Sequence, residues 1–536
     1  MTFTKKHYLC GSLIFIIVAA PLVYWQCFRA VPLRISPVTT FITEPLTSDG
    51  KRVDYFLALE QLLYPPEMKT EDNGYRMILQ SFGLPQSDRR EYCENLRRQF
   101  YEKLGLDPDV EPTHEFKGAW SFLERDEYFA FERESWRDPW TLDTFPDLAE
   151  KLADWLAQDQ VGLDRLAEAV RKSAFQFPMV REEDETSLSR AIYNFRIETF
   201  QQFRSFARTV KARANYRIGI GDIDGAIEDI LTIYHLGRHV ARRGLTDYLV
   251  GIAIEGTALG IPIAGNPDHP PTKEQLAYFL QELDRLPPPV TWQTIWEPER
   301  LANLGILQEY LDTPVENGEN FGYDLVSLSW RFPIFDANVM FMAINRFFDA
   351  VLDLPTQDAA GIAHFETKYL RSRNPFRYLT VQSRSEQVAY EIVNPLEHPG
   401  LPAMQLMIMQ RNECADRLNR LTLALLLYEA EHGNLPEGDW RLAIKPYLGE
   451  VGDDHFRCPS QDTGYALVLT DEKTPETLLL VEAPLENISA IGTIENDPSL
   501  FAEAHSLPSW RSSFRNVSFR NGTVRSENTV PRVPCC

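Results

Sequence analysis

The chain has 536 residues, of which 44% are hydrophobic, and this length and composition fit about two to four domains with buried cores. Its formal net charge of −23 excludes a general nucleic-acid binder, because such proteins need a basic surface, and mainly favours solubility. The seven cysteines include no CxxC pair, so the sequence indicates neither a disulfide scaffold nor a zinc ribbon.

The N-terminal residues contain a long apolar run, from Tyr8 to Phe28, which Arg29 follows. This run is long enough to cross a bilayer as a helix, and Trp25 suits the membrane interface. We expect residues 1–30 to form a cytoplasmic tip and an uncleaved transmembrane anchor. The expected location is the inner membrane, with one pass and the bulk of the chain on the extracytoplasmic side. A cleaved signal peptide is the alternative.

The next part of the chain divides into a linker and a long helical region. Residues 31–50 contain three prolines, which is typical of a semi-rigid linker. Apolar residues at spacings of three and four predict a mainly helical ectodomain over residues 51–400. One predicted helix, residues 189–210, carries many arginines on its polar face. These arginines either hold an acidic partner or pair with carboxylates of the same chain.

The clearest pattern lies in residues 212–260, which predict two helices joined by a short turn. Gly219 and Gly221 are expected to end the first helix, and Asp222 or Asp224 to cap the second. The turn sequence GDIDGAIED resembles the turn of a tetratricopeptide repeat, a family in which small residues let paired helices pack. Since only one copy is found, an ordinary helical hairpin is the alternative.

The C-terminal residues 401–536 predict a small α+β domain that ends in a flexible tail. Residues 405–432 form one long predicted helix, which Gly433 stops. The segments GYALVLT and TLLLVEAP predict strands, and Asn521-Gly522 predicts the turn of a last hairpin.

Two resemblances arise from these motifs. The segment LTLALLLYEAEHGNLPEGDWRLAIKPYL and the final NVSFRNGTV resemble type II secretion pseudopilins and the tails of prepilin-like proteins. The whole layout resembles uncharacterised single-pass membrane proteins of planctomycetes, which imply no activity. The chain departs from prepilins because the long helix lies far from the N-terminal apolar run and no prepilin processing motif precedes that run.

Three residues are candidates for chemistry. His235 and His239 are four residues apart, so both rings could face one metal ion, although structural histidines are the alternative. Glu255 is a lone carboxylate in an apolar helix, which predicts either a perturbed catalytic acid or a buried pair with Arg238 or Arg242. We assign no catalytic, cofactor-binding or metal-binding residue, and we expect no cofactor.

The sequence therefore predicts a mainly α fold with an N-terminal transmembrane helix, a helical ectodomain with a tetratricopeptide-like hairpin, and a small α+β C-terminal domain. The leading functional hypothesis is a non-catalytic envelope scaffold whose protein partner binds the helices of residues 190–260. A membrane-anchored hydrolase with a site near His235, His239 and Glu255 is the first alternative. A prepilin-like component of secretion or pilus assembly is the second.

Overall fold

The structure is a computed structural model, and it describes part of the chain. The longer described stretches are residues 32–83, 90–114, 146–181, 188–312, 336–356, 359–370, 381–393 and 401–449. The shorter ones are residue 19 and residues 456–457, 463–469, 478–484, 493–495, 514–519 and 524–528. Backbone contacts divide the chain into two compact units, each of which is built from three separate segments.

Unit 1 consists of Met1–Pro65, Met179–Asn194 and Thr291–Leu406. Its helices are α2 (Tyr55–Leu63), α11 (Trp292–Asp312), α13 (Ala337–Leu352), α14 (Ala359–Phe365) and α15 (Val381–Val393), with short turns at Leu354–Thr356 and Glu366–Leu370. α11 packs against α2 and α13, and α13 also packs against α15. The core is aromatic: Tyr55 and Phe341 stack at 6.4 Å, and the buried Trp292 donates its indole N–H to the Val351 carbonyl at 2.8 Å.

The proline-containing segment before α2 is held against α13 by side-chain hydrogen bonds. Asn338 donates from Nδ2 to the Pro32 carbonyl at 3.0 Å, and its Oδ1 accepts from the backbone N–H of Arg34 at 2.8 Å. Asn345 donates to the Thr39 carbonyl at 2.8 Å. Residues 32–40 therefore have fixed contacts within unit 1, in the segment expected to be a linker.

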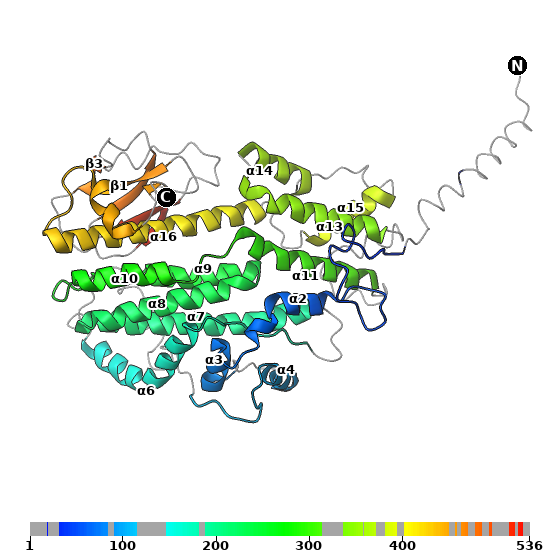
Figure 1. The fold of residues 1–536 in the computed structure, drawn as a ribbon, viewed down its shortest axis with the longest axis horizontal. Helices are drawn as coiled ribbons and strands as arrows, with labels where there is room; N and C mark the ends of the chain where they lie inside the picture. The colour runs from blue at the N-terminus through cyan, green and yellow to red at the C-terminus, as the bar shows by residue number, and fades with distance from the viewer. Residues whose placement is uncertain are drawn as a thin grey trace, which may run out of the picture. The chain divides into compact units, whose positions relative to one another are not determined.

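Unit 2 consists of Pro66–Pro178, Phe195–Val290 and Met407–Cys536. Its helices are α3 (Gly74–Phe82), α4 (Arg90–Lys103), α6 (Pro146–Val170), α7 (Leu188–Ile220, which begins in unit 1), α8 (Ile223–Val240), α9 (Leu245–Leu259), α10 (Lys273–Arg285), α16 (Leu401–His432, which also begins in unit 1) and α17 (Trp440–Ile444). Short 3-10 turns occupy Pro66–Met68, Ala241–Arg243 and Lys445–Leu448. α8 is central and packs against α6, α9 and α10 (Figure 1).

Local sequence explains where the central helices begin and end. α7 ends at Ile220, and Gly221 follows with a φ of 81°, a left-handed value that glycine adopts without strain. Asp222 caps α8, because its side chain accepts a hydrogen bond from the Gly225 N–H at 3.0 Å. Both features confirm the predicted helix–turn–helix. Gly433, with a φ of 81°, follows the end of α16 at His432, as predicted.

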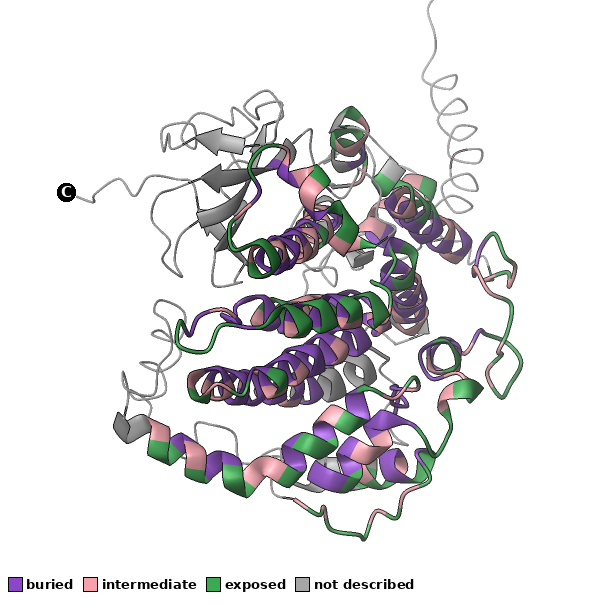
Figure 2. Cartoon of the chain, turned by 60° about the vertical axis from the view of Figure 1, so that its left-hand side comes forward, coloured by how far each residue is buried: buried purple, intermediate pink, exposed green. Residues whose placement is uncertain are grey.

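The helices of unit 2 meet through buried faces and keep exposed residues on their outer sides (Figure 2). An aromatic cluster joins α3, α7 and the segment after α6, with Tyr75 at its centre. Its ring lies 4.8 Å from that of Phe177 and 5.9 Å from that of Phe203. α8 is buried almost all round, from Ile223 to Val240. Rings and branched side chains of this size supply most of the hydrophobic stabilisation of such a core.

The C-terminal strands form one five-stranded sheet in the order β3-β1-β2-β4-β5. The strands are β1 (Thr463–Leu469), β2 (Leu478–Pro484), β3 (Thr493–Glu495), β4 (Phe514–Phe519) and β5 (Val524–Asn528). All pairs are antiparallel except β1 with β3, which is parallel. Tyr465 of β1 is buried, and its hydroxyl donates to the Cys414 carbonyl of α16 at 3.2 Å.

The structure corrects the expected fold class. The predicted anchor, residues 8–28, lies outside the described residues apart from Ala19. Among the helices that are described, none combines the length and the apolar character needed to cross a bilayer. The strands group with the helices of unit 2 instead of forming a separate α+β domain. The mainly helical character is confirmed, but the fold class with a transmembrane helix and a separate α+β domain is wrong for the described residues.

Candidate functional site

His239 of α8 has a structural role at the end of α6. Its Nε2 lies 2.8 Å from the carbonyl oxygen of Val170, the last residue of α6, whose carbonyl lacks an intrahelical partner. The imidazole also stacks on Phe175, with ring centroids 4.7 Å apart. Burial lowers the pKa of His239 to about 3, and the charge of Arg242 adds to this shift. The ring is therefore neutral at pH 7, and Nε2–H donates to the carbonyl.

His235 lies one turn before His239 on the same side of α8, and the two ring centroids are 6.5 Å apart. Burial lowers the pKa of His235 to about 4, the charge of Arg171 lowers it further, and Glu228 opposes the shift. Among the described residues, no group of three or more His, Cys, Asp or Glu side chains is arranged to hold a metal ion.

Glu255 of α9 contacts a side of α8 other than the one that carries His235 and His239. Its Oε1 is 3.4 Å from Nε of Arg238, and both side chains are almost completely buried. Burial raises the pKa of Glu255 to about 7, Arg238 opposes this shift, and the charge of Asp416 on α16 adds to it. The predicted buried pair of Glu255 with Arg238 or Arg242 is confirmed, and the partner is Arg238.

The structure does not bring the three sequence candidates into one site. His239 contacts the end of α6 and Phe175, whereas Glu255 contacts Arg238 on the side of α8 that faces α16. Positions 238 and 239 differ by about 100° around a helix, so the two groups point to different neighbours. Each candidate is used in a contact within unit 2.

A pocket of about 560 Å³ lies beside α8, and three helices line it. α6 contributes Asp164, Ala167 and Glu168, and the turn that follows it contributes Arg171 and Lys172. α7 contributes Arg213 and Arg217. α8 contributes Gly225, Glu228, Asp229 and Thr232. The residues from each helix are separated by about one turn, so each helix presents one stripe to the pocket.

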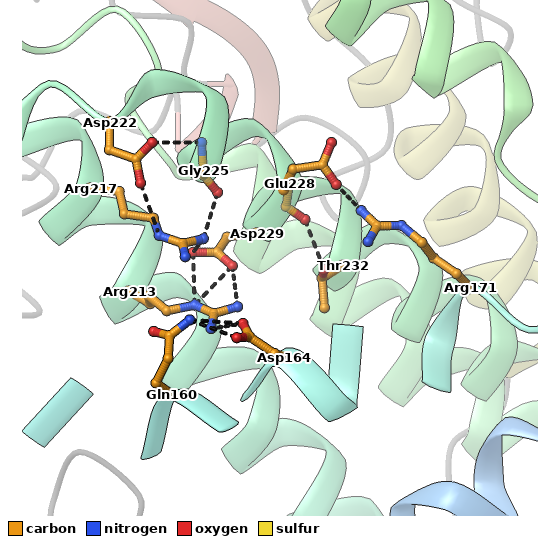
Figure 3. A network of polar contacts seen from close by, with 10 residues as sticks. All are labelled: Gln160, Asp164, Arg171, Arg213, Arg217, Asp222, Gly225, Glu228, Asp229 and Thr232. Carbon is orange, nitrogen blue, oxygen red and sulfur yellow. Dashed lines mark hydrogen bonds and ion pairs between the residues drawn. The ribbon is translucent and has the colours of Figure 1, made fainter. Parts of the chain in front are cut away.

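A buried ion-pair network forms one wall of the pocket (Figure 3). Asp229 accepts from Nη2 of Arg213 at 2.5 Å and from Nη1 of Arg217 at 2.9 Å. Arg213 also reaches Asp164 of α6 at 3.0 Å. Burial raises the pKa of Asp229, and the two guanidinium groups oppose that shift. The side chains of Arg213 and Asp229 are 3% and 1% exposed, so this wall is fixed by packing as well as by charge.

The second wall consists of more exposed pairs. Arg171 donates to Glu228, and Figure 3 shows these side chains apart from the buried network. Tyr278 of α10 donates to the other oxygen of Glu228 at 2.5 Å. Lys172 pairs with Asp72 at 2.8 Å. The pocket thus combines a rigid charged wall with side chains that solvent reaches.

Sequence reasoning located some of these residues and missed others. The arginines of α7 were expected to bind an acidic partner or to pair with carboxylates of the chain, and Arg213 and Arg217 do pair with Asp229. The charged stripe on α6 was missed because the apolar spacing of this helix dominates its sequence pattern. Its signal is the spacing of Asp164 and Glu168, which places two charges on one helical face, and Arg171 follows directly after the helix.

No protein-family model, curated protein or solved structure matches this chain. The resemblances to pseudopilins and to planctomycete membrane proteins stay predictions from sequence. The contacts and charges of unit 2 are therefore the basis on which a function can be proposed.

Proposed function

We propose that this protein is a non-catalytic scaffold or interaction module whose partner binds through the helices of residues 190–260. The observation that carries the proposal is the pocket, because it is the place where charged side chains of α7 and α8 line an open surface. Buried ion pairs hold some of these charges in fixed positions, which lowers the entropic cost of binding. The candidate catalytic groups are instead engaged in contacts within unit 2.

The accessible part of residues 190–260 limits where a partner can bind. Most of α8 is buried, whereas Asp222 and Asp224 at its start are exposed. On α9, Ala253 and Gly256 are exposed. We infer that the partner contacts the start of α8 and the adjacent pocket, since those surfaces lie together and carry directional polar groups.

Crosslinking of the full chain in cells, followed by affinity purification and mass spectrometry, tests this proposal. Glu168→Lys reverses a half-exposed charge on the pocket, and Glu102→Lys makes the same change on the exposed face of α4. We expect a stoichiometric partner that Glu168→Lys removes and Glu102→Lys retains. A homogeneous preparation without a partner would contradict the scaffold hypothesis.

The alternative is a hydrolase, expected near His235, His239 and Glu255, and it keeps Glu255 alone as a candidate catalytic group because His239 contacts a different side of α8. One observation favours it. The pKa of Glu255, raised to about 7, is of the kind found in general acids. Hydrolysis of ester or peptide substrates that is lost in Glu255→Gln, with the fold intact, would support it.

Two further proposals rest on sequence alone. A role in secretion or pilus assembly depends on the resemblance of residues 405–530 to pseudopilins, and lack of N-terminal processing by a prepilin peptidase would count against it. The envelope location depends on residues 8–28, which lie outside the described part. Fractionation of cells with and without these residues tests the location.

A further inference from the structure

Buried polar contacts in unit 2 connect α16 to α8 and α9, and in them carboxylates from two different helices face one guanidinium. We propose that α16 is a pH-dependent latch, in which loss of the proton on Glu255 opens residues 407–418 of α16 away from α8 and α9. The inference goes beyond the proposed scaffold function, because it describes a movement within the chain and requires no partner.

The first observation is that Arg238 of α8 is shared between Glu255 of α9 and Asp416 of α16. Its Nε lies 3.4 Å from Oε1 of Glu255, and its Nη2 lies 3.9 Å from Oδ1 of Asp416. The side chains of Arg238 and Glu255 are 5% and 4% exposed, and that of Asp416 is 19% exposed. Both distances exceed the length of a charge-assisted hydrogen bond, about 2.7–2.9 Å, so the single guanidinium satisfies neither carboxyl group fully.

The second observation is that α16 helps to enclose Glu255. The aliphatic part of Glu255 packs on Gly237 of α8. From α16, Asn412 hydrogen-bonds to the Glu255 carboxyl group, and Asp416, one turn later, adds a like charge. α8 and α9 cross in close contact at Gly237 and Gly251, whereas the contacts that join α16 to this site are made by side chains. The helix that can move to admit water is therefore α16.

The third observation concerns the described charged and titratable groups around Glu255, which come from all three helices. They are Tyr234, Arg238 and Arg242 of α8, Tyr248 of α9, and Glu413, Asp416, Arg417 and Arg420 of α16. Burial raises the pKa of Tyr234 and of Tyr248, so both stay neutral between pH 6 and pH 8. Burial raises the pKa of Glu255 to about 7, Arg238 opposes this shift, and Asp416 adds to it. The proton that is lost near neutral pH is therefore that of Glu255.

These contacts define two states of the latch. When Glu255 is protonated, Arg238 is available to Asp416 and links α8 to α16. When Glu255 is ionised, its carboxylate competes for Arg238 and repels Asp416. The new charge is also buried beneath α16, where it lacks the hydration that an ionised carboxylate has in water. Movement of α16 relieves both the repulsion and the burial.

A second set of contacts limits which part of α16 opens. Arg420 donates to the Leu283 carbonyl of α10 at 2.8 Å. Asn419 donates to the hydroxyl of Tyr234 at 3.1 Å. Because both contacts lie outside the group that competes for the guanidinium, they hold the later part of α16 in both states. We therefore expect the opening over residues 407–418.

Amide hydrogen exchange of the full chain, measured by mass spectrometry at pH 6 and pH 8, tests the proposal. Each rate is divided by the rate of the same unfolded peptide at the same pH, which removes the base catalysis of exchange. If the Glu255 pKa is about 7 when α16 is closed and returns to 4.5 when it is open, the opening constant increases about tenfold from pH 6 to pH 8. We expect this change in residues 407–418, and less than about a twofold change in α6, a reference helix of the same unit.

Variants assign the effect to the latch. Glu255→Gln removes the titrating group, so the protection of residues 407–418 should no longer depend on pH. Asp416→Asn removes the like charge that raises the Glu255 pKa, so the increase from pH 6 to pH 8 should be smaller than tenfold. Asp416 is part-exposed, so this second variant should fold, which circular dichroism checks. Glu274→Gln, at an exposed glutamate of α10, is the control and should keep the full increase.

Three results would overturn the proposal. Equal acceleration of α6 and of residues 407–418 would show a loss of stability throughout unit 2 instead of an opening of α16. Protection of residues 407–418 that is the same at pH 6 and pH 8 would show that no latch operates. A pH effect that persists in Glu255→Gln would assign the titration to another group.

Discussion

Gly251 of α9 lies so close to Gly237 of α8 that a Cβ atom added at Gly251 would be 2.6 Å from the Gly237 carbonyl oxygen. The two helices cross where neither has a side chain, and the aliphatic part of Glu255 fills the adjacent space against Gly237. This contact holds Arg238 and Glu255 together inside unit 2.

We expect Gly251→Ala to lower the free energy of unfolding by about 1–3 kcal/mol, because the new methyl group must push the two backbones apart. Gly256→Ala on the same helix is the control. A Cβ there has open space, so alanine should be neutral or stabilise by up to about 1 kcal/mol through its helix propensity. Urea denaturation measures both, and equal effects of the two variants would contradict this packing.

The raised pKa of Glu255, about 7 against an ordinary 4.5, predicts a pH dependence of stability. The folded protein holds this proton more tightly than the unfolded chain. The contribution to stability is therefore fully present below pH 4.5 and is lost as the pH rises through 7. Glu255→Gln removes the titration. The wild type loses this stabilisation as the pH rises, and the variant does not. We therefore expect the free energy of unfolding of Glu255→Gln minus that of the wild type to increase by about 2 kcal/mol from pH 5 to pH 8.

Chemical denaturation at several pH values measures this difference. Glu274→Gln, at an exposed glutamate of α10, is the control and should follow the wild-type profile. A wild-type minus Glu255→Gln difference that is independent of pH would show that Glu255 does not titrate in this range.

The bond from His239 to Val170 predicts a structural phenotype instead of a catalytic one. His239→Phe keeps a ring against Phe175 but leaves the Val170 carbonyl without its donor, so we expect a loss of about 1–3 kcal/mol at pH 7. The folded-state pKa of His239 is depressed to about 3, so its contribution is lost as the pH falls from about 6.5 towards 3. The difference in the free energy of unfolding between His239→Phe and the wild type should therefore become smaller at acidic pH.

Nitrogen chemical shifts from NMR provide a second measurement for His239. We expect the neutral tautomer with the proton on Nε2 throughout pH 5–8. A ring that becomes protonated at pH 6 would contradict the buried arrangement.

The Arg213–Asp229 pair should stabilise the unit 2 fold far more than any exposed pair does. Asp229→Asn leaves two guanidinium groups beside a neutral side chain, and we expect a loss of about 3–5 kcal/mol. Disruption of the exposed pair between Lys273 and Glu274, by Glu274→Gln, should change stability little. Thermal unfolding compares Asp229→Asn with Glu274→Gln. A similar melting temperature for both variants would argue against a buried network.

In unit 1, the hydrogen bonds of Asn345 predict that residues 32–40 are protected. Asn345→Ala removes the donor to the Thr39 carbonyl, and we expect faster amide hydrogen exchange in this segment. Arg346→Ala, at the neighbouring half-exposed position on α13, is the control. Rapid exchange of residues 32–40 already in the wild-type protein would show that the segment is a free linker.

Several features could be predicted from sequence because they depend on neighbouring residues. The end of α7, the start of α8 and the end of α16 were predicted from glycine and aspartate, whose local conformations and hydrogen bonds act within one turn. The pairing of Glu255 with Arg238 or Arg242 was also anticipated, since a carboxylate in an apolar helix needs a compensating charge, and the structure selects Arg238. The mainly helical content was predicted from apolar spacing.

Other features needed the tertiary structure. The sequence alone identified charged residues on α7 and α8, but residues from three helices form the pocket only once α8 lies against its neighbours. Likewise, His235 and His239 suggested a metal site by spacing, while packing directs His239 to Val170 and Glu255 to another side of α8. Local propensities act over a few residues, whereas the partner of a buried polar group is chosen by which distant segment packs against it.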